Sequence, residues 1–128
     1  WRGDHPAVLV GGGSGLVPLM AMLRLARQTR RSDLVRLVAS VRTPDDLFYA
    51  DELPGPETTV VYTRAAPPGT SRPAGRLTAN DLAPALLADA TVYVCGSTGF
   101  AEAASRLLVG LGVEVPRIRV ERFGPSGS

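Results

Sequence analysis

A glycine-rich turn follows the first apolar segment of this chain, and it constrains the fold more than any other feature. Residues 7–10 read Ala-Val-Leu-Val, and residues 11–15 read Gly-Gly-Gly-Ser-Gly. Across residues 16–30, apolar side chains then recur at helical spacing. The order of strand, glycine turn and helix is typical of the first unit of a sheet whose parallel strands are connected by helices.

Further strands and helices are expected along the rest of the chain. β-branched and apolar runs predict strands at residues 34–40, 58–63, 91–95 and 117–122, with Gly96 ending the third of these. Helices are expected at residues 43–53, 79–88 and 99–111, and Gly112 suits the C-cap of the last one. The alternation predicts an α/β fold: a doubly wound, Rossmann-like parallel sheet of five or six strands, with helices on both faces.

Composition excludes several classes of function. The net charge of +2, without a basic run, argues against nucleic-acid binding. The single cysteine, Cys95, excludes a disulfide or a four-cysteine iron–sulfur cluster within the chain, and no metal site is expected. No apolar run approaches the ~20 residues that a transmembrane helix needs. All 14 basic residues are Arg, which is typical of a GC-rich coding sequence, so a bacterial cytoplasmic protein is expected.

The ligand site is expected where parallel strands end, at the glycine turn and at the turn formed by residues 95–99. Glycines let the backbone approach a ligand closely, and the helix that follows favours a pyrophosphate. No Lys-Ser or Lys-Thr follows, which excludes a nucleoside-triphosphate P-loop. Pro18 follows where the third glycine of a Rossmann dehydrogenase is missing. A turn that only redirects the chain is the alternative.

Five segments together resemble the NAD(P)-binding domain of the ferredoxin–NADP reductase family, in its bacterial oxygenase-reductase and flavohaemoprotein branch. They are Gly-Ser-Gly-Leu-Val-Pro at 13–18, the segment at 42–53, Gly-Arg-Leu at 75–77, Val-Cys-Gly-Ser-Thr-Gly-Phe at 94–100 and Glu-Arg-Phe-Gly at 121–124. Their order and spacing cover nearly the whole chain. Ser97 stands where the family usually has Pro.

The resemblance implies nucleotide contacts at both turns and at the ends of the second and third strands. It places Gly13 and Gly15 beside the pyrophosphate, with Pro18 shaping the turn. Further nucleotide contacts are expected in the two turns at Gly12, Ser14, Gly96, Ser97 and Thr98, and also at Cys95. Near the ribose and a 2′-phosphate it places Ser40, Arg42, Thr63, Arg64 and Arg76. Because no acidic residue ends the second strand, NADP is expected, with NAD as the alternative. A salt bridge to Asp45 or Asp46 is the alternative role for Arg42.

The resemblance also implies a junction between nicotinamide and flavin formed by Cys95, Glu121 and Phe123. Glu121 and Phe123 alternate along the last strand and are expected on one face. Nothing in the sequence lowers the pKa of Cys95, so its expected role is positioning rather than nucleophilic attack. Plain core packing for Cys95 and an ordinary half-buried strand end for the other two are the alternatives.

The family's chemistry implies that this chain is one part of a larger reductase. NAD(P)H would pass a hydride to FAD, held mainly by a missing N-terminal domain, and electrons would leave to an iron–sulfur protein, a haem or an oxygenase. Residues 1–6 are then a linker, 7–124 the NAD(P)-binding domain and 125–128 a flexible tail. The fragment alone is expected to be inactive. The alternative is a non-catalytic doubly wound nucleotide-binding or signalling domain.

Overall fold

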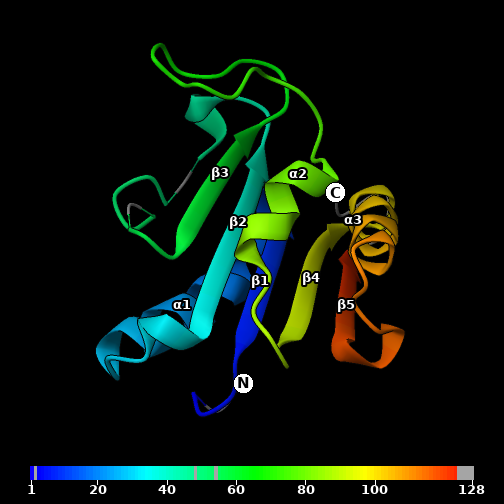
Figure 1. Ribbon diagram of the computed structural model, residues 1–128. Helices are drawn as coiled ribbons and strands as arrows, with labels where there is room; N and C mark the ends of the chain where they lie inside the picture. The colour runs from blue at the N-terminus through cyan, green and yellow to red at the C-terminus, as the bar shows by residue number, and fades with distance from the viewer. Residues whose placement is uncertain (2, 48, 54, 124–128) are drawn as a thin grey trace.

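Five parallel strands form one sheet in the computed structural model, which describes residues 1, 3–47, 49–53 and 55–123. The spatial order is β3-β2-β1-β4-β5, with every neighbouring pair parallel (Figure 1). The strands are β1 Ala7–Gly12, β2 Val35–Val41, β3 Thr58–Tyr62, β4 Thr91–Ser97 and β5 Ile118–Phe123. The predicted five-stranded parallel sheet is therefore confirmed for the described residues.

Helices cover the two faces of this sheet. Helix α1, Leu16–Gln28, packs Leu19 and Leu23 against Leu9 on one face. Helices α2, Ala79–Leu82, and α3, Thr98–Gly110, lie on the other face, where Leu108 packs in the same cluster as Val10 (Figure 1). Alternate residues of β1 thus enter two separate cores, as expected for a central strand of a doubly wound sheet.

Two of the predicted helices are much shorter in the structure. Among the described residues of 43–53, helical structure is limited to Pro44–Asp46, as one 3₁₀ turn. Thr43 and Asp46 form a capping box, but the chain then turns and buries Leu53 in the core. The helix expected at 79–88 ends at Leu82 and continues as a 3₁₀ turn, Ala83–Ala85, in which Pro84 lacks the N–H that an α-helix needs.

The fourth strand continues through Gly96 to Ser97, so the prediction that Gly96 ends it was wrong. Gly96 pairs in register with Arg122 of β5. A side chain there would collide with Phe100, because a Cβ added at Gly96 would lie 2.7 Å from the ring. Glycine therefore provides room for an aromatic ring and does not interrupt the strand. Gly112, with φ +93°, has the left-handed conformation expected of a C-cap residue after α3.

Membrane-spanning helices are absent from the part of the chain that the structure describes, where none is both long and apolar enough. The predicted tail at 125–128, together with Gly124, lies outside the described residues.

Candidate nucleotide-binding site

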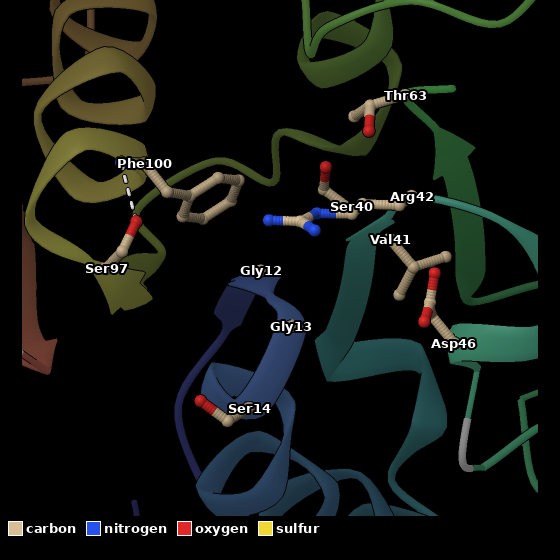
Figure 2. A pocket seen from close by; sticks show the side chains of 10 residues that line it. All are labelled: Gly12, Gly13, Ser14, Ser40, Val41, Arg42, Asp46, Thr63, Ser97 and Phe100. Atoms are coloured by element: carbon tan, nitrogen blue, oxygen red, sulfur yellow. Dashed lines mark hydrogen bonds between the residues drawn. The ribbon is translucent and has the colours of Figure 1, made fainter. Parts of the chain in front are cut away.

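A pocket of about 620 Å³ opens at the carboxyl ends of β1, β2 and β3, facing the start of α3. We call it the glycine pocket. Figure 2 shows its lining side chains, which come from four stretches of the sequence, within 12–14, 40–46, 63 and 97–100. The lining residues are Gly12, Gly13, Ser14, Ser40, Val41, Arg42, Asp46, Thr63, Ser97 and Phe100. Seven of these ten were predicted from sequence: all except Val41, Asp46 and Phe100.

The glycine turn forms the floor of this pocket. Gly13 has φ +54°, and a Cβ built there meets no atom within 4 Å, so its backbone faces open space. Helix α1 then begins at Leu16 with no side-chain cap. An uncapped helix start beside an open pocket leaves positive partial charge for an anionic ligand.

Gly15 is not part of the pocket lining, although the sequence predicted contact with a pyrophosphate. It is buried beneath the turn, where a Cβ would overlap the carbonyl of Cys95 and lie 2.7 Å from the backbone nitrogen of Gly96. Gly15 thus allows the first turn to pack directly against the second. Gly15 therefore lies at a close backbone contact between the two turns that were predicted to bind the ligand.

The second turn begins helix α3 through Ser97. The Oγ of Ser97 accepts a hydrogen bond from the backbone N–H of Phe100, at 3.2 Å. Serine at the N-cap thus gains a hydrogen bond that proline could not provide, which is a physical reason for the departure from the family's usual residue. Gly96, which is buried, and Thr98, which is half-buried, do not line the pocket.

Arg42 leaves the end of β2 and points its guanidinium into the glycine pocket, toward Phe100 (Figure 2). The salt bridge to Asp45 or Asp46 that was the alternative does not form within the described residues. Instead, Asp46 accepts hydrogen bonds from the backbone N–H and the hydroxyl of Thr43, at 3.2 and 3.0 Å. The positive charge of Arg42 therefore remains available to a ligand.

Two predicted arginines lie outside the pocket lining. The side chains of Arg64 and Arg76 are exposed, and only Thr63 from this part of the chain lines the pocket. The backbone N–H of Arg64 donates to the carbonyl of Arg42, at 2.9 Å, which places Arg64 next to the rim. Sequence reasoning did not assign a role to Arg72, whose guanidinium binds both carboxylate oxygens of Asp81 at 2.6 and 2.9 Å.

A second hollow, of about 610 Å³, contains most of the predicted flavin-junction residues. We call it the Cys95 hollow; it is lined by Pro18, Leu19, Met22, Tyr93, Cys95, Arg119, Val120 and Glu121. Cys95 and Glu121 are paired across β4 and β5. The backbone of Phe123 belongs to β5, but the prediction for its side chain lies outside the part of the chain whose side chains the structure describes.

Burial raises the pKa of the Cys95 thiol, and the nearby negative charge of Glu121 raises it further. Cys95 as a whole residue is 4% exposed. Both effects favour the neutral thiol over the thiolate, which is the nucleophilic form. The local electrostatics therefore disfavour the thiolate form of Cys95, and its positioning role stays a prediction.

The glycine turn joins the two hollows. Gly12, Gly13 and Ser14 line the glycine pocket, whereas Pro18, in the first turn of α1, lines the Cys95 hollow. Between them, Gly15 packs on Cys95. An extended ligand lying along this segment would therefore have one end in each hollow.

Among the three missed lining residues, Phe100 had the clearest signal in the sequence. It directly follows the second turn, residues 95–99, and is the aromatic residue of the segment 94–100 that resembles the family. The sequence indicated Asp46 as a helix-capping residue. Its position at the pocket, however, depends on the short 3₁₀ turn that forms in place of the predicted helix.

Comparisons with known proteins agree with this geometry. Residues 9–106 match the family model described as the oxidoreductase NAD-binding domain. A flavohemoprotein from Pseudomonas putida is 35% identical over 98% of this chain and 34% of its own length. The ferredoxin–NAD(P)(+) reductase component of naphthalene 1,2-dioxygenase/salicylate 5-hydroxylase systems from Ralstonia is 31% identical, over 95% of this chain and 39% of its own length. The chain thus spans little more than a third of either relative.

A solved structure has the same fold. It is the flavohem-like FAD/NAD-binding domain of nitric oxide dioxygenase from Vibrio cholerae, with a TM-score of 0.76 and 25% sequence identity. The match covers 95% of this chain and 52% of that one.

Proposed function

Because the chain belongs to the oxidoreductase NAD-binding domain family, we propose that it is the nucleotide-binding part of a flavin reductase. In this function it holds NAD(P)H while a hydride leaves the nicotinamide for FAD on a preceding domain. The observation that carries the proposal is the pair of hollows joined by the glycine turn. One hollow suits the adenosine half of the nucleotide, and the other suits the nicotinamide.

The central pyrophosphate would lie on the glycine turn. The uncapped start of α1 and the open backbone at Gly13 fit an anion at close approach. Ser14 and Ser97 add hydroxyl groups beside it. Gly12, Gly15, Pro18, Gly96 and Thr98 shape the two turns that bring these groups together.

The adenosine half would lie in the glycine pocket, near Ser40, Arg42 and Thr63. The guanidinium of Arg42 has no ion-pair partner in the described part of the chain, which leaves it available to phosphate oxygens. Arg64 and Arg76 are exposed side chains that can approach from the rim. These three positive charges favour the 2′-phosphate of NADP over the bare ribose of NAD.

The nicotinamide would lie in the Cys95 hollow, close to Cys95 and Glu121. The flavin supplies the acceptor for the hydride when it is bound. The chain's own residues hold the ring and exclude water from it: Cys95 as a neutral thiol, Glu121 as a hydrogen-bond acceptor for the carboxamide, and Phe123 at the strand end. Holding donor and acceptor at close approach is the main catalytic contribution of such a domain.

The proposed parent protein has an FAD-binding domain before this chain, with residues 1–6 as the linker and 7–124 as the nucleotide-binding domain. Its electrons would leave to an iron–sulfur protein, a haem or an oxygenase. The open Cys95 hollow, which includes the apolar residues Leu19, Met22 and Val120, supports an interface with that domain. The arginine-only basic composition and the use of NAD(P)H support a bacterial cytoplasmic protein.

Calorimetric titration of the chain with NADP⁺ and then NAD⁺ at low salt tests the proposal. We expect NADP⁺ to bind more tightly, and Arg64→Ala to remove that preference. Arg106→Ala is the matched control, because Arg106 is exposed on α3, lines neither hollow and changes the net charge equally. Equal or tighter binding of NAD⁺ would overturn the NADP assignment and point to Asp46 as an acceptor for ribose hydroxyls.

Hydride transfer is tested by adding the separately produced FAD-binding domain. With NADPH present, we expect the flavin absorption to disappear only when this chain is also added. Cys95→Ala should slow the bleaching while leaving the affinity for NADP⁺ nearly unchanged, since the adenosine half dominates binding. If the flavin is reduced equally fast without the chain, the proposed function is wrong.

A further inference from the structure

The six residues before β1 fold back against the rest of the chain. We call residues 1–6 the entry segment, of which the structure describes residues 1 and 3–6. At its first residue, the indole N–H of Trp1 donates a hydrogen bond to the carbonyl of His5, at 2.6 Å. At its last, the carbonyl of Pro6 accepts a hydrogen bond from the N–H of Thr91, the first residue of β4, at 3.0 Å. The entry segment is therefore held at both of its ends.

The Trp1 ring packs beside helix α1. It is partly buried against the core cluster that contains Leu19 and Leu23. Gly3, with φ +85°, turns the chain back in the left-handed conformation that glycine adopts readily. A Cβ added at Gly3 would lie 3.9 Å from Leu25 Cδ2 and 4.0 Å from Trp1 Cζ3, so both side chains lie close to this turn. Tryptophan buries a large apolar area and needs a partner for its N–H, and the entry segment provides both.

One side of α1 leads from the entry segment to the Cys95 hollow. Pro18 and Met22 line that hollow, and Leu25 lies near the turn of the entry segment. Because residues at positions i, i+4 and i+7 share one side of a helix, these three form a continuous strip about 10 Å long. Trp1 lies at one end of this strip and the Cys95 hollow at the other. Figure 1 shows the N-terminus beside the lower, amino end of β1.

We propose that Trp1 is a positioning residue: it fixes the point at which the preceding FAD-binding domain joins this chain, and so orients the flavin toward the Cys95 hollow. The inference rests on the proposed function, which places the nicotinamide in that hollow and the FAD-binding domain before residue 1. A domain on a flexible linker samples many orientations, whereas a domain on an anchored linker samples few. Hydride transfer needs donor and acceptor at close approach, so an anchored connection favours the productive arrangement.

Trp1 is the only tryptophan in the chain, so its fluorescence measures the anchor directly. Because the ring is partly buried, we expect the folded chain to emit at shorter wavelength than the chain unfolded in urea. Gly3→Ala strains the turn and should move the emission maximum toward the unfolded value. Asp4→Ala is the matched control, since Asp4 is exposed in the same segment, and it should leave the maximum unchanged. Equal maxima for the folded and unfolded chains would overturn the anchor.

The functional test uses the intact reductase, in which the FAD-binding domain and this chain form one polypeptide. Trp1→Ala should slow flavin reduction by NADPH about 10- to 100-fold, because misplacement by about 1 Å can cost on the order of 100-fold. The affinity for NADP⁺ should stay unchanged, since Trp1 lines neither hollow. Trp1→Phe keeps an aromatic ring beside α1 and should retain most of the rate, and Asp4→Ala should retain all of it.

Separately produced domains distinguish positioning from a purely structural role. Without a peptide connection, the Trp1→Ala chain should support reduction of the added FAD-binding domain as fast as the unaltered chain does. Slowing by the same factor with separate and with connected domains would mean that Trp1 acts on the fold of this chain, and would overturn the inference. An intact Trp1→Ala reductase as fast as the unaltered one would overturn it too. If the unaltered intact reductase does not reduce its flavin with NADPH, the proposed function itself fails.

Discussion

Among the glycines that the structure describes, Gly15 is the one at which an added Cβ would come closest to backbone atoms. Any side chain would overlap the backbone of Cys95 and Gly96, and backbone cannot move aside as a flexible side chain can. Gly99, by contrast, is exposed in the first turn of α3, and a Cβ there meets no atom within 4 Å. The two glycines are chemically identical, and their surroundings determine the effect of a methyl group.

We expect Gly15→Ala to destabilise the fold by more than about 2 kcal/mol, in the range of severe overpacking. Gly99→Ala should instead raise stability by about 0.5–1 kcal/mol, because alanine has the higher helix propensity. Urea unfolding of both variants measures the two free energies. A Gly15→Ala variant as stable as the unaltered chain would contradict the close packing of the two turns.

Cys95 should resist alkylation in the folded chain. Because burial and Glu121 raise its pKa, the thiolate fraction near neutral pH is smaller than for a free thiol. Glu121→Gln removes the nearby negative charge and should move the pH profile of iodoacetamide alkylation toward lower pH. Glu102→Gln, an exposed change on α3, is the matched control and should leave the profile unchanged. Identical profiles for all three proteins would exclude an electrostatic effect of Glu121.

At the scale of elements, Asp81 connects helix α2 to the preceding loop. Its carboxylate accepts hydrogen bonds from Arg72 and from the N–H and hydroxyl of Thr78. Burial opposes ionisation of Asp81, but the bonds from Arg72 and Thr78 outweigh it and hold the pKa of this carboxyl below its ordinary value. The ionised form is therefore part of the folded structure.

A group whose folded-state pKa is lowered stabilises the fold above its unfolded pKa, and this contribution is lost as pH falls through the folded pKa. We expect Asp81→Asn to lower the free energy of unfolding by about 1–2 kcal/mol at pH 7, through loss of the cap and its charged partner. The difference should shrink as the pH falls below about 4, where the carboxyl of the unfolded chain becomes protonated. Urea titrations of both proteins at pH 7 and at low pH measure this difference in the free energy of unfolding.

Asp51→Asn is the control for that comparison, because Asp51 is exposed and has no side-chain partner within the part of the chain that the structure describes. Its effect should be small at both pH values. A constant difference between Asp81→Asn and the unaltered chain from pH 7 to pH 3 would exclude the lowered pKa.

The sequence predicted elements well where a single local pattern determines them. The buried run of β1, the period of α1 and the C-cap at Gly112 were all correct because each depends on neighbouring residues. The helix expected at 43–53 failed because its later apolar residues turn into the core, which a local pattern does not reveal. Pro84 could have indicated that α2 ends early, because proline cannot donate the backbone hydrogen bond that a helix interior needs.

For the candidate site, as for the helices and strands, the sequence predicted the features that depend on local patterns and missed those that depend on tertiary contacts. Glycine turns and strand ends can be recognised from the sequence. In the structure they lie together at the carboxyl ends of the strands. Which side chains then enter the pocket depends on tertiary placement: Arg42 lines it, whereas Arg64 and Arg76 do not. Asp46 was missed because its place in the pocket depends on the short 3₁₀ turn at Pro44–Asp46, and Phe100 because its ring reaches the pocket only through the way helix α3 begins.

At the scale of the whole molecule, nucleotide binding should stabilise the fold. A ligand at about 100 times its dissociation constant adds about 2.7 kcal/mol, which corresponds to an increase in Tm of about 10 °C for a chain of this size. Differential scanning fluorimetry with NADP⁺ measures the shift, and Arg106→Ala should respond like the unaltered chain. An unchanged Tm at millimolar NADP⁺ would contradict a preformed site.

The position of β1 at the centre of the sheet also determines the order in which the molecule can be assembled. Val8 pairs with Arg36 on one side and with Val92 on the other. During synthesis, β1 can therefore pair with β2 early, because β2 follows it closely along the chain. Its other edge stays unpaired until β4 has been synthesised. During that interval the apolar strand β1 has an unpaired edge, which chaperones can recognise, until residues 91–97 emerge and pair with it.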